Sequence, residues 1–287
     1  MLSFWNRLPV VVRAVVFGAV AATAGTVPWA ALAAANLQFF TIVPWSVPVM
    51  AVYLAVLWRY APRTNRRANQ LSDEVWAAAL FAGILGLWAV VLLQSVMSRM
   101  VRLPAQQTGD LSRVPVLTLI VMLIMSAIIA GVVEETSFRG YMQGPIERRH
   151  GPVAAILATG SLFGFAHVSH PEVTVILMPY YIAVAAVYGG LAYLTNSTLP
   201  GMLLHAVGNV FVFIQLLATG RAEWQAAPKP EPLIRETGAD ATFWITVGAA
   251  TVVAAAAVGA YASLAGIARG ARVRSAGSPP ECSPRYL

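Results

Sequence analysis

Two adjacent glutamates stand directly after a long apolar run, a place where carboxylates are costly. Glu134 and Glu135 follow the apolar residues 114–133, and Arg139 lies four residues after Glu135. A spacing of four with the acid first favours a helical ion pair between Glu135 and Arg139, which leaves Glu134 on another face. A carboxylate placed in this way can act as a general base. The alternative is a solvated helix end with an ordinary salt bridge.

Two histidines and an asparagine lie within later apolar segments. The sequence Phe163-Gly-Phe-Ala-His167 ends one of these segments, and His205 precedes Asn209 by four residues in another. That spacing puts the His205 imidazole and the Asn209 carboxamide on one helix face. Each feature alone also fits a packing histidine or a hydrogen bond between helices. Polar side chains inside membrane helices nevertheless indicate function by default.

A helical hairpin is expected to bring the first two features together. Glu134 lies sixteen residues before His150, and His167 lies sixteen residues after Gly151. If the chain turns at His150-Gly151-Pro152, each side chain lies about 24 Å from the turn, at about 1.5 Å per residue. The carboxylate and the imidazole then face each other across adjacent helices, and a third helix can add the remaining polar pair.

Composition places these helices in a membrane. Of the 287 residues, 58% are hydrophobic and only 11% are charged, with a mean hydropathy of +0.69. A soluble domain carries about 25% charged residues. The net charge of +7 is expected of arginines beside membrane spans, so we reject a nucleic-acid partner. The single cysteine, Cys282, excludes a disulfide framework.

The apolar runs predict an all-α, polytopic transmembrane bundle with an intramembrane polar cavity. Eight spans are expected, at residues 14–35, 39–58, 75–97, 114–133 with a helical extension, 152–167, 173–194, 199–218 and 242–265. The expected organisation is N-terminal helices in 1–113, a core that carries the polar motifs in 114–218, a loop and last helix in 219–268, and a disordered basic tail in 269–287. Gly160 and Gly164 form a small-xxx-small pair typical of helix packing. The first run also fits a cleavable signal peptide.

The positive charges predict the orientation of the bundle. Thirteen of the 19 Lys and Arg residues fall on the side that holds both termini, and six fall on the other. The richer side is expected to be cytoplasmic. We therefore expect an integral protein of the cell membrane with both ends in the cytoplasm.

Taken together, the motifs resemble one protein family. Glu134-Glu135-x-x-x-Arg139, Phe163-x-x-x-His167 and His205-x-x-x-Asn209 stand in this order on successive apolar segments. This arrangement resembles the CAAX protease and bacteriocin-processing (CPBP, or Abi) family, which includes the type II CAAX prenyl endopeptidases. The resemblance covers about residues 114–218. It implies an intramembrane endopeptidase, usually described as a metalloprotease, that acts on a peptide or protein substrate.

The resemblance also implies roles for the residues. Glu134 would activate water, and His167 would assist it or hold a metal. His205 and Asn209 would bind a metal or stabilise the oxyanion, and Glu135 with Arg139 would position Glu134. Two imidazoles and a carboxylate match a catalytic zinc site, so a divalent metal, zinc, is expected at His167 and His205.

Alternatives to this mechanism and this function stay open. A metal-free mechanism, with glutamate and histidine activating water, is the alternative chemistry. A non-catalytic peptide-binding or immunity protein of the same fold is the alternative function. A small-solute or proton transporter is a third possibility, which the absence of an internal repeat disfavours.

One geometric problem accompanies the expected site. Counting spans places His205 near the cytoplasmic start of its helix and His167 near the far end of its own. The two meet only if the hairpin projects beyond the membrane or if a span is broken, for which Pro171 and Pro179 are candidates.

Overall fold

In the computed structural model the chain folds into a bundle of helices of unequal length. Residues 7–39, 41–102, 114–167, 171–219 and 232–277 are described, and within them no strand occurs. The helices are α2 (Val10–Phe39), α3 (Ser46–Tyr60), α4 (Arg63–Arg66), α5 (Asp73–Met100), α6 (Val116–Ile129), η1 (Ala130–Gln143), α7 (Gly144–His150), α8 (Pro152–Ala166), α9 (Pro171–Thr195), α10 (Leu199–Thr219), α11 (Ile234–Thr237) and α12 (Ala241–Gly277). This confirms the predicted all-α bundle.

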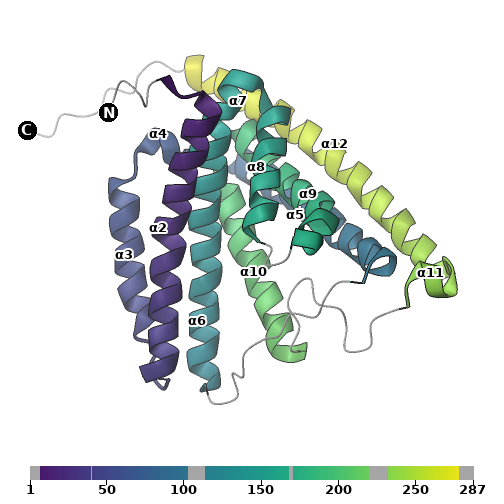
Figure 1. Ribbon diagram of the computed structural model, residues 1–287. Helices are drawn as coiled ribbons and strands as arrows, with labels where there is room; N and C mark the ends of the chain where they lie inside the picture. Colours follow the sequence, from purple (N-terminus) through teal and green to yellow (C-terminus); the bar gives the residue numbers. More distant parts are fainter. Residues whose placement is uncertain (1–6, 40, 103–113, 168–170, 220–231, 278–287) are drawn as a thin grey trace, which may run out of the picture.

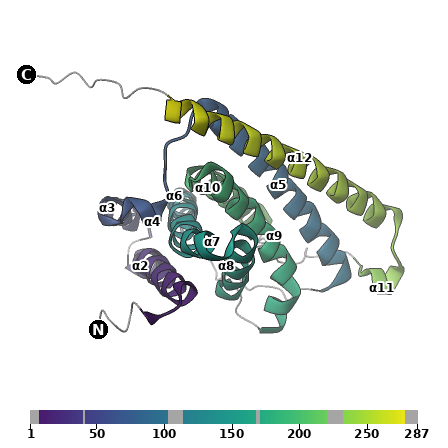
Figure 2. The same ribbon diagram turned by 90° about the horizontal axis from the view of Figure 1, so that it is seen from above.

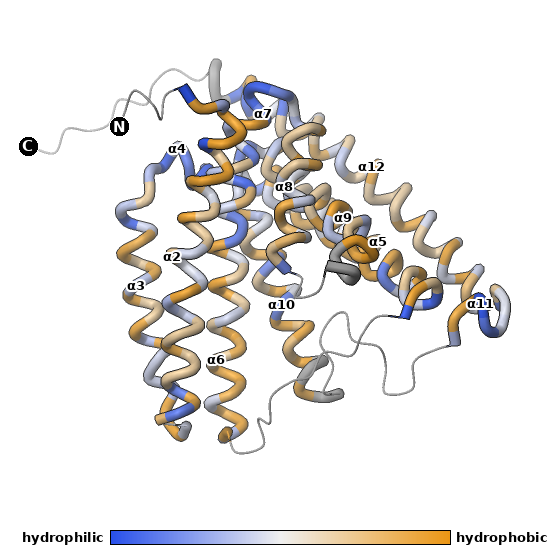
Figure 3. Tube along the Cα trace, in the orientation of Figure 1, coloured by the Kyte–Doolittle hydropathy of each residue, from blue (hydrophilic) through white to orange (hydrophobic). Residues whose placement is uncertain are grey.

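The helices differ in whether they are long enough to cross a membrane. Five continuous helical stretches are long and apolar enough, at Val10–Phe39, Asp73–Met100, Val116–His150, Val175–Thr195 and Ala241–Arg274. The other three expected spans correspond to α3, α8 and α10, whose described apolar stretches are shorter. Figure 3 shows apolar residues along the helices, with hydrophilic residues gathered at α4, α7 and α11.

The arrangement is layered around η1. Seen from above, α2 and α3 lie on one side of the bundle and the pair α5 and α12 on the other, with η1, α8, α9 and α10 between them (Figure 2). The start of α2 and the end of α12 lie at the same end of the bundle (Figure 1). Helix α2 packs closely on η1, because Gly25 abuts Val133 and Gly18 abuts Met142.

The predicted hairpin is present and positions the site. Helix α7 ends at His150, Gly151 takes a positive φ of 83° that glycine adopts readily, and α8 begins at Pro152. A side-chain carbon at Gly160 would lie 2.8 Å from Ala185, so only glycine allows α8 and α9 to pack this closely. The expected role of this glycine in helix packing is confirmed.

Helix α10 begins beside the middle of η1 rather than at the tip of the hairpin. Gly201, in its first turn, lies against the Glu135 carboxylate, and the Thr198 hydroxyl donates to the Arg66 carbonyl oxygen at 2.9 Å. The hairpin therefore continues past the start of α10. This offset brings His205 level with Glu134, with 3.7 Å between His205 Nε2 and Glu134 Oε2.

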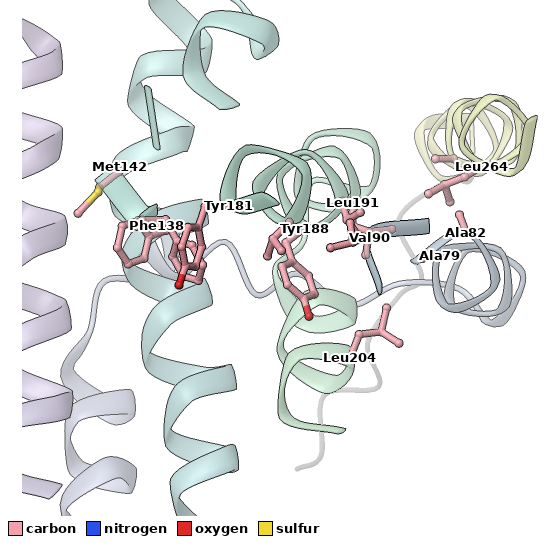
Figure 4. Close-up of a cluster of buried hydrophobic side chains, with 14 of the residues drawn as sticks. Ala79, Ala82, Val90, Phe138, Met142, Tyr181, Tyr188, Leu191, Leu204 and Leu264 are labelled. Carbon is pink, nitrogen blue, oxygen red and sulfur yellow. The ribbon is translucent and has the colours of Figure 1, made fainter. Parts of the chain in front are cut away.

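A hydrophobic cluster ties the site helices to the outer pair. Figure 4 shows Phe138 of η1, Tyr181 and Tyr188 of α9, and, farther along, Leu264 of α12 next to Ala82 of α5. All five are buried in one core. The core thus runs from η1 through α9 to α5 and α12, and it fixes the wall of α9 that faces the glutamates.

The expected tail differs from the structure. Disorder was predicted from residue 269, but α12 continues as helix to Gly277. In this segment Arg274 ion-pairs with Glu74 of the neighbouring helix α5 at 2.7 Å. Residues 278–287 lie outside the described part.

Candidate active site

The glutamates lie on a segment wound as a π-helix. Residues Ala130–Gln143 form η1, in which the hydrogen bonds span five residues. Such winding is rare and is frequently found at functional sites. Glu135, Arg139 and Gln143 are spaced by four residues, close to one turn of this wider helix, and all three are fully buried. The sequence indicated a helical extension here but not its winding.

Glu134 is the carboxylate at the centre of the site. Its Oε2 atom lies 3.7 Å from His167 Nε2 and 3.7 Å from His205 Nε2. That oxygen is buried, yet it has no hydrogen-bond partner among the described residues. A buried polar atom without a partner calls for an explanation. An oxygen poised between two imidazoles is suited to accept a proton from a small molecule such as water.

The tautomer of His167 follows from its partner. Its Nδ1 lies 2.8 Å from the Phe163 carbonyl oxygen, which can only accept, so Nδ1 carries a hydrogen. In the neutral ring Nε2 then presents a lone pair toward Glu134. The Phe163 ring packs on the imidazole with 4.1 Å between centroids. Phe163 thus fixes His167 through both its backbone and its side chain.

His205 is held by the second glutamate. Its Nδ1 lies 3.0 Å from Glu135 Oε1, and Glu135 Oε2 lies 3.5 Å from Arg139 Nε. The Glu135 and Arg139 side chains are each 1% exposed. The resemblance implied that this pair positions Glu134, whereas the contact made by Glu135 is with His205. Glu135 is therefore unavailable as a base, because both of its oxygens are already used inside the protein.

Aromatic rings surround the buried arginine and the second histidine. The Tyr188 ring stacks on His205 at 5.0 Å between centroids with 13° between planes. Arg139 Cζ lies 5.1 Å from the centroid of Phe163 and 5.4 Å from that of Tyr188. Cation–π contacts of this kind help to hold a desolvated guanidinium. Sequence reasoning did not identify Tyr188, although Tyr181 and Tyr188 are seven residues apart and so share one face of α9.

These groups open into one cavity of about 170 Å³. Glu134, His167, His205 and Asn209 line it on the polar side, and aliphatic residues of α5 such as Val90 line the opposite wall. Four of the six polar residues predicted for the site therefore reach the same space. Arg139 and Glu135 do not line it; Glu135 contacts His205 and Arg139 contacts Glu135.

The fit of a metal can be judged from the donors. Within the described residues, no group of three or more His, Cys, Asp or Glu side chains meets the geometry of a metal site. Ligands of a tetrahedral zinc ion at about 2.1 Å lie about 3.4 Å apart, close to the 3.7 Å separations around Glu134 Oε2. His167 and His205 are the imidazole donors that would hold such an ion, with Glu134 left as the base. That the protein binds zinc stays a prediction, which metal analysis of the purified protein can test. Zinc would lower the pKa of a bound water to about 7.

Comparison with known proteins adds one finding. Residues 116–211, about a third of the chain, match the family described as type II CAAX prenyl endopeptidase Rce1-like. No curated protein and no solved structure matches the chain. The family match spans the predicted polar residues of the site, from Glu134 to Asn209, but not the α5 wall of the cavity. It supports the predicted resemblance of this segment to the CAAX protease family.

Proposed function

We propose that the protein is an intramembrane endopeptidase that hydrolyses a peptide bond of a membrane-associated substrate. The observation that carries this proposal is the buried, unpartnered Oε2 of Glu134, which lies 3.7 Å from two imidazole nitrogens inside a cavity. The match of this segment to a family of prenyl endopeptidases supports it.

Glu134 and His167 activate the attacking water in this proposal. Water bound in the cavity donates one hydrogen toward Glu134 Oε2, and the lone pair of His167 Nε2 holds the other. The water oxygen bonds to the carbonyl carbon of the substrate as Glu134 takes the proton. Glu134 then gives that proton to the leaving nitrogen as the carbon–nitrogen bond breaks. One positioned base of this kind contributes about 10²–10⁴-fold to the rate.

His205 and Asn209 stabilise the negative oxygen that forms in this step. They stand one turn apart on α10 and line the same cavity. His205 Nε2 donates when the ring carries both protons, and the Glu135 carboxylate behind it balances that charge. The Asn209 amide is the second donor. Donors fixed in advance at such an oxygen are usually the largest electrostatic contribution to catalysis.

An apolar groove supports a lipid-anchored substrate. A hollow of about 560 Å³ between α5, α9 and α12 is lined by small residues such as Ala186 and Ala254, and Val90 lines both this groove and the catalytic cavity. A substrate whose peptide enters the cavity could lay a prenyl chain in the groove. We therefore propose a prenylated peptide, with an unmodified bacteriocin-like peptide as the alternative.

Cleavage of synthetic peptides by the purified full-length protein tests this function. Glu134→Gln keeps the volume of the side chain and removes the base, so turnover should fall by about 10²–10⁴-fold. Glu74→Gln makes the same change on an exposed surface carboxylate and should leave turnover unchanged. Prenylated and unmodified forms of each peptide are compared. Equal turnover by wild type and Glu134→Gln would contradict the proposed mechanism, and binding without cleavage would favour the non-catalytic peptide-binding function.

A further inference from the structure

A second hollow lies behind the catalytic helix, between α2, α3 and η1. We call it the α2–α3 crevice; its volume is about 310 Å³, and Ala21, Leu54 and Val132 are among its lining residues. Figure 2 shows α2 and α3 on the side of the bundle away from α9 and α10. Val52 and Val56 of α3 are exposed, as expected for a helix that faces lipid chains. The crevice is therefore within reach of a bilayer and separate from the catalytic cavity.

Positive charge gathers where the crevice meets α4. The guanidinium of Arg66 lies over the Trp58 ring at 4.5 Å, and Trp58 lines the crevice. Arg59 and Arg63 adjoin lining residues in sequence, on either side of Tyr60-Ala61-Pro62. Within the described part of the chain, none of these three arginines forms an ion pair with a carboxylate. Figure 3 shows hydrophilic α4 next to the apolar helices α2 and α3.

Buried polar atoms without partners mark the same place. The Nε of Arg66 is buried and has no hydrogen-bond partner among the described residues, and the same holds for the Thr136 hydroxyl. Thr136 lines the crevice, and so does Tyr141, five residues later on η1. A donor without a partner in an apolar wall costs about 1–3 kcal/mol unless a ligand or water satisfies it. An arginine and a hydroxyl thus flank an apolar trough at its charged end.

From this juxtaposition we infer that the α2–α3 crevice binds one anionic phospholipid of the surrounding membrane. The phosphate lies on Arg66 with Arg59 and Arg63 around it, the Thr136 hydroxyl donates to an ester carbonyl, and an acyl chain fills the trough. Charge complementarity selects an anionic headgroup, and the apolar trough favours a lipid over free phosphate. The bound lipid braces α3 against the helix that carries the catalytic glutamate. This inference is independent of the proposed protease activity.

Thermal unfolding of the delipidated full-length protein in detergent tests the site. Phosphatidylglycerol, phosphatidylcholine with the same acyl chains, and inorganic phosphate are titrated separately. Phosphatidylglycerol should raise the unfolding temperature, and the other two should not. Arg66→Gln and Arg63→Gln, which changes an exposed arginine, should each need about fivefold more phosphatidylglycerol for the half-maximal shift in unfolding temperature. This factor is the contribution expected of one basic residue to binding an anionic lipid.

The trough is tested by a separate variant. Ala21→Trp fills it while every arginine stays in place, and this variant should lose the shift. Arg149→Gln removes an exposed arginine on α7 and should respond as wild type does. An equal shift with phosphatidylcholine, a full shift with phosphate alone, or wild-type affinity in both Arg66→Gln and Arg63→Gln would overturn the inference.

Discussion

Replacing Glu135 by glutamine should destabilise the protein far more than the same change at Glu134. Glutamine keeps the size of Glu135 and an oxygen that can accept from His205 Nδ1, so the substitution removes mainly the negative charge. Arg139 then stays buried, 1% exposed, without the carboxylate now 3.5 Å from its Nε. Leaving one charge of a buried pair alone costs about 3–5 kcal/mol. At about 2–4 °C per kcal/mol, the unfolding temperature should fall by roughly 6–20 °C.

A double-mutant cycle separates this cause from a general loss of packing. In Glu135→Gln/Arg139→Gln the orphaned cation is removed as well, so the double variant should be more stable than the sum of the single effects predicts. A coupling free energy of about 0.5–3 kcal/mol is expected for residues in contact. Unfolding is followed in detergent by near-ultraviolet circular dichroism. Glu134→Gln is the matched control and should unfold close to wild type, because Glu134 Oε2 has no partner to lose.

Two results would refute this reasoning. The first is an unfolding temperature of Glu135→Gln within about 2 °C of wild type, which would mean that the charge of Glu135 is not needed inside the fold. The second is strict additivity in the cycle, which would place the cost in packing rather than in the ion pair.

Three further predictions concern the metal, pH and topology. If zinc is present, purified active protein should contain about one zinc per chain, and both His167→Ala and His205→Ala should lose it. Full activity after complete chelation would exclude the zinc mechanism and favour the metal-free one. The Arg99 guanidinium, with the Phe243 backbone N–H, lowers the pKa of Asp240 in the folded protein. The contact therefore stabilises the fold at pH values above the usual aspartate pKa of about 3.9. This stabilisation is lost as the pH falls through the lower pKa of the folded state. Lowering the pH from 6 to 3 should therefore reduce the free energy of unfolding of wild type more than that of Asp240→Asn. Equal losses in the two proteins would exclude this contribution. Reporter fusions at the two ends of the chain should both read cytoplasmic, and a signal from the other side at either end would reject the orientation inferred from the positive charges.

Much of the bundle could be predicted because local chemistry dictates it. Apolar runs of about 20 residues have few alternatives to helix in a membrane, since lipid offers no hydrogen bonds to the backbone. Gly151 and Pro152 mark the turn of the hairpin, and equal counting from that turn places Glu134 opposite His167. These inferences depend only on neighbours in sequence and on the regular rise of a helix.

The sequence also indicated which polar residues share a face. Spacing of four residues pairs Glu135 with Arg139 and His205 with Asn209, and these spacings do not depend on where the helices sit. The partner of the other Glu135 carboxylate oxygen, Oε1, could not be predicted from spacing. That oxygen contacts His205, seventy residues away, and only the packing of α10 against η1 brings the two together.

Three features were decided by the tertiary structure alone: where α10 begins relative to η1, the π-helical winding of η1, and the stacking of the Tyr188 ring on His205. Span counting assumes that each apolar segment begins at a membrane surface, but α10 begins where Gly201 meets the Glu135 carboxylate. The π winding depends on how η1 fits its neighbours, and no local pattern specifies it. Tyr188 reaches His205 only because α9 packs beside α10. The sequence thus determined the helices and the chemistry each one carries, whereas the contacts between helices determined which groups meet, because those contacts depend on packing between segments far apart in the chain.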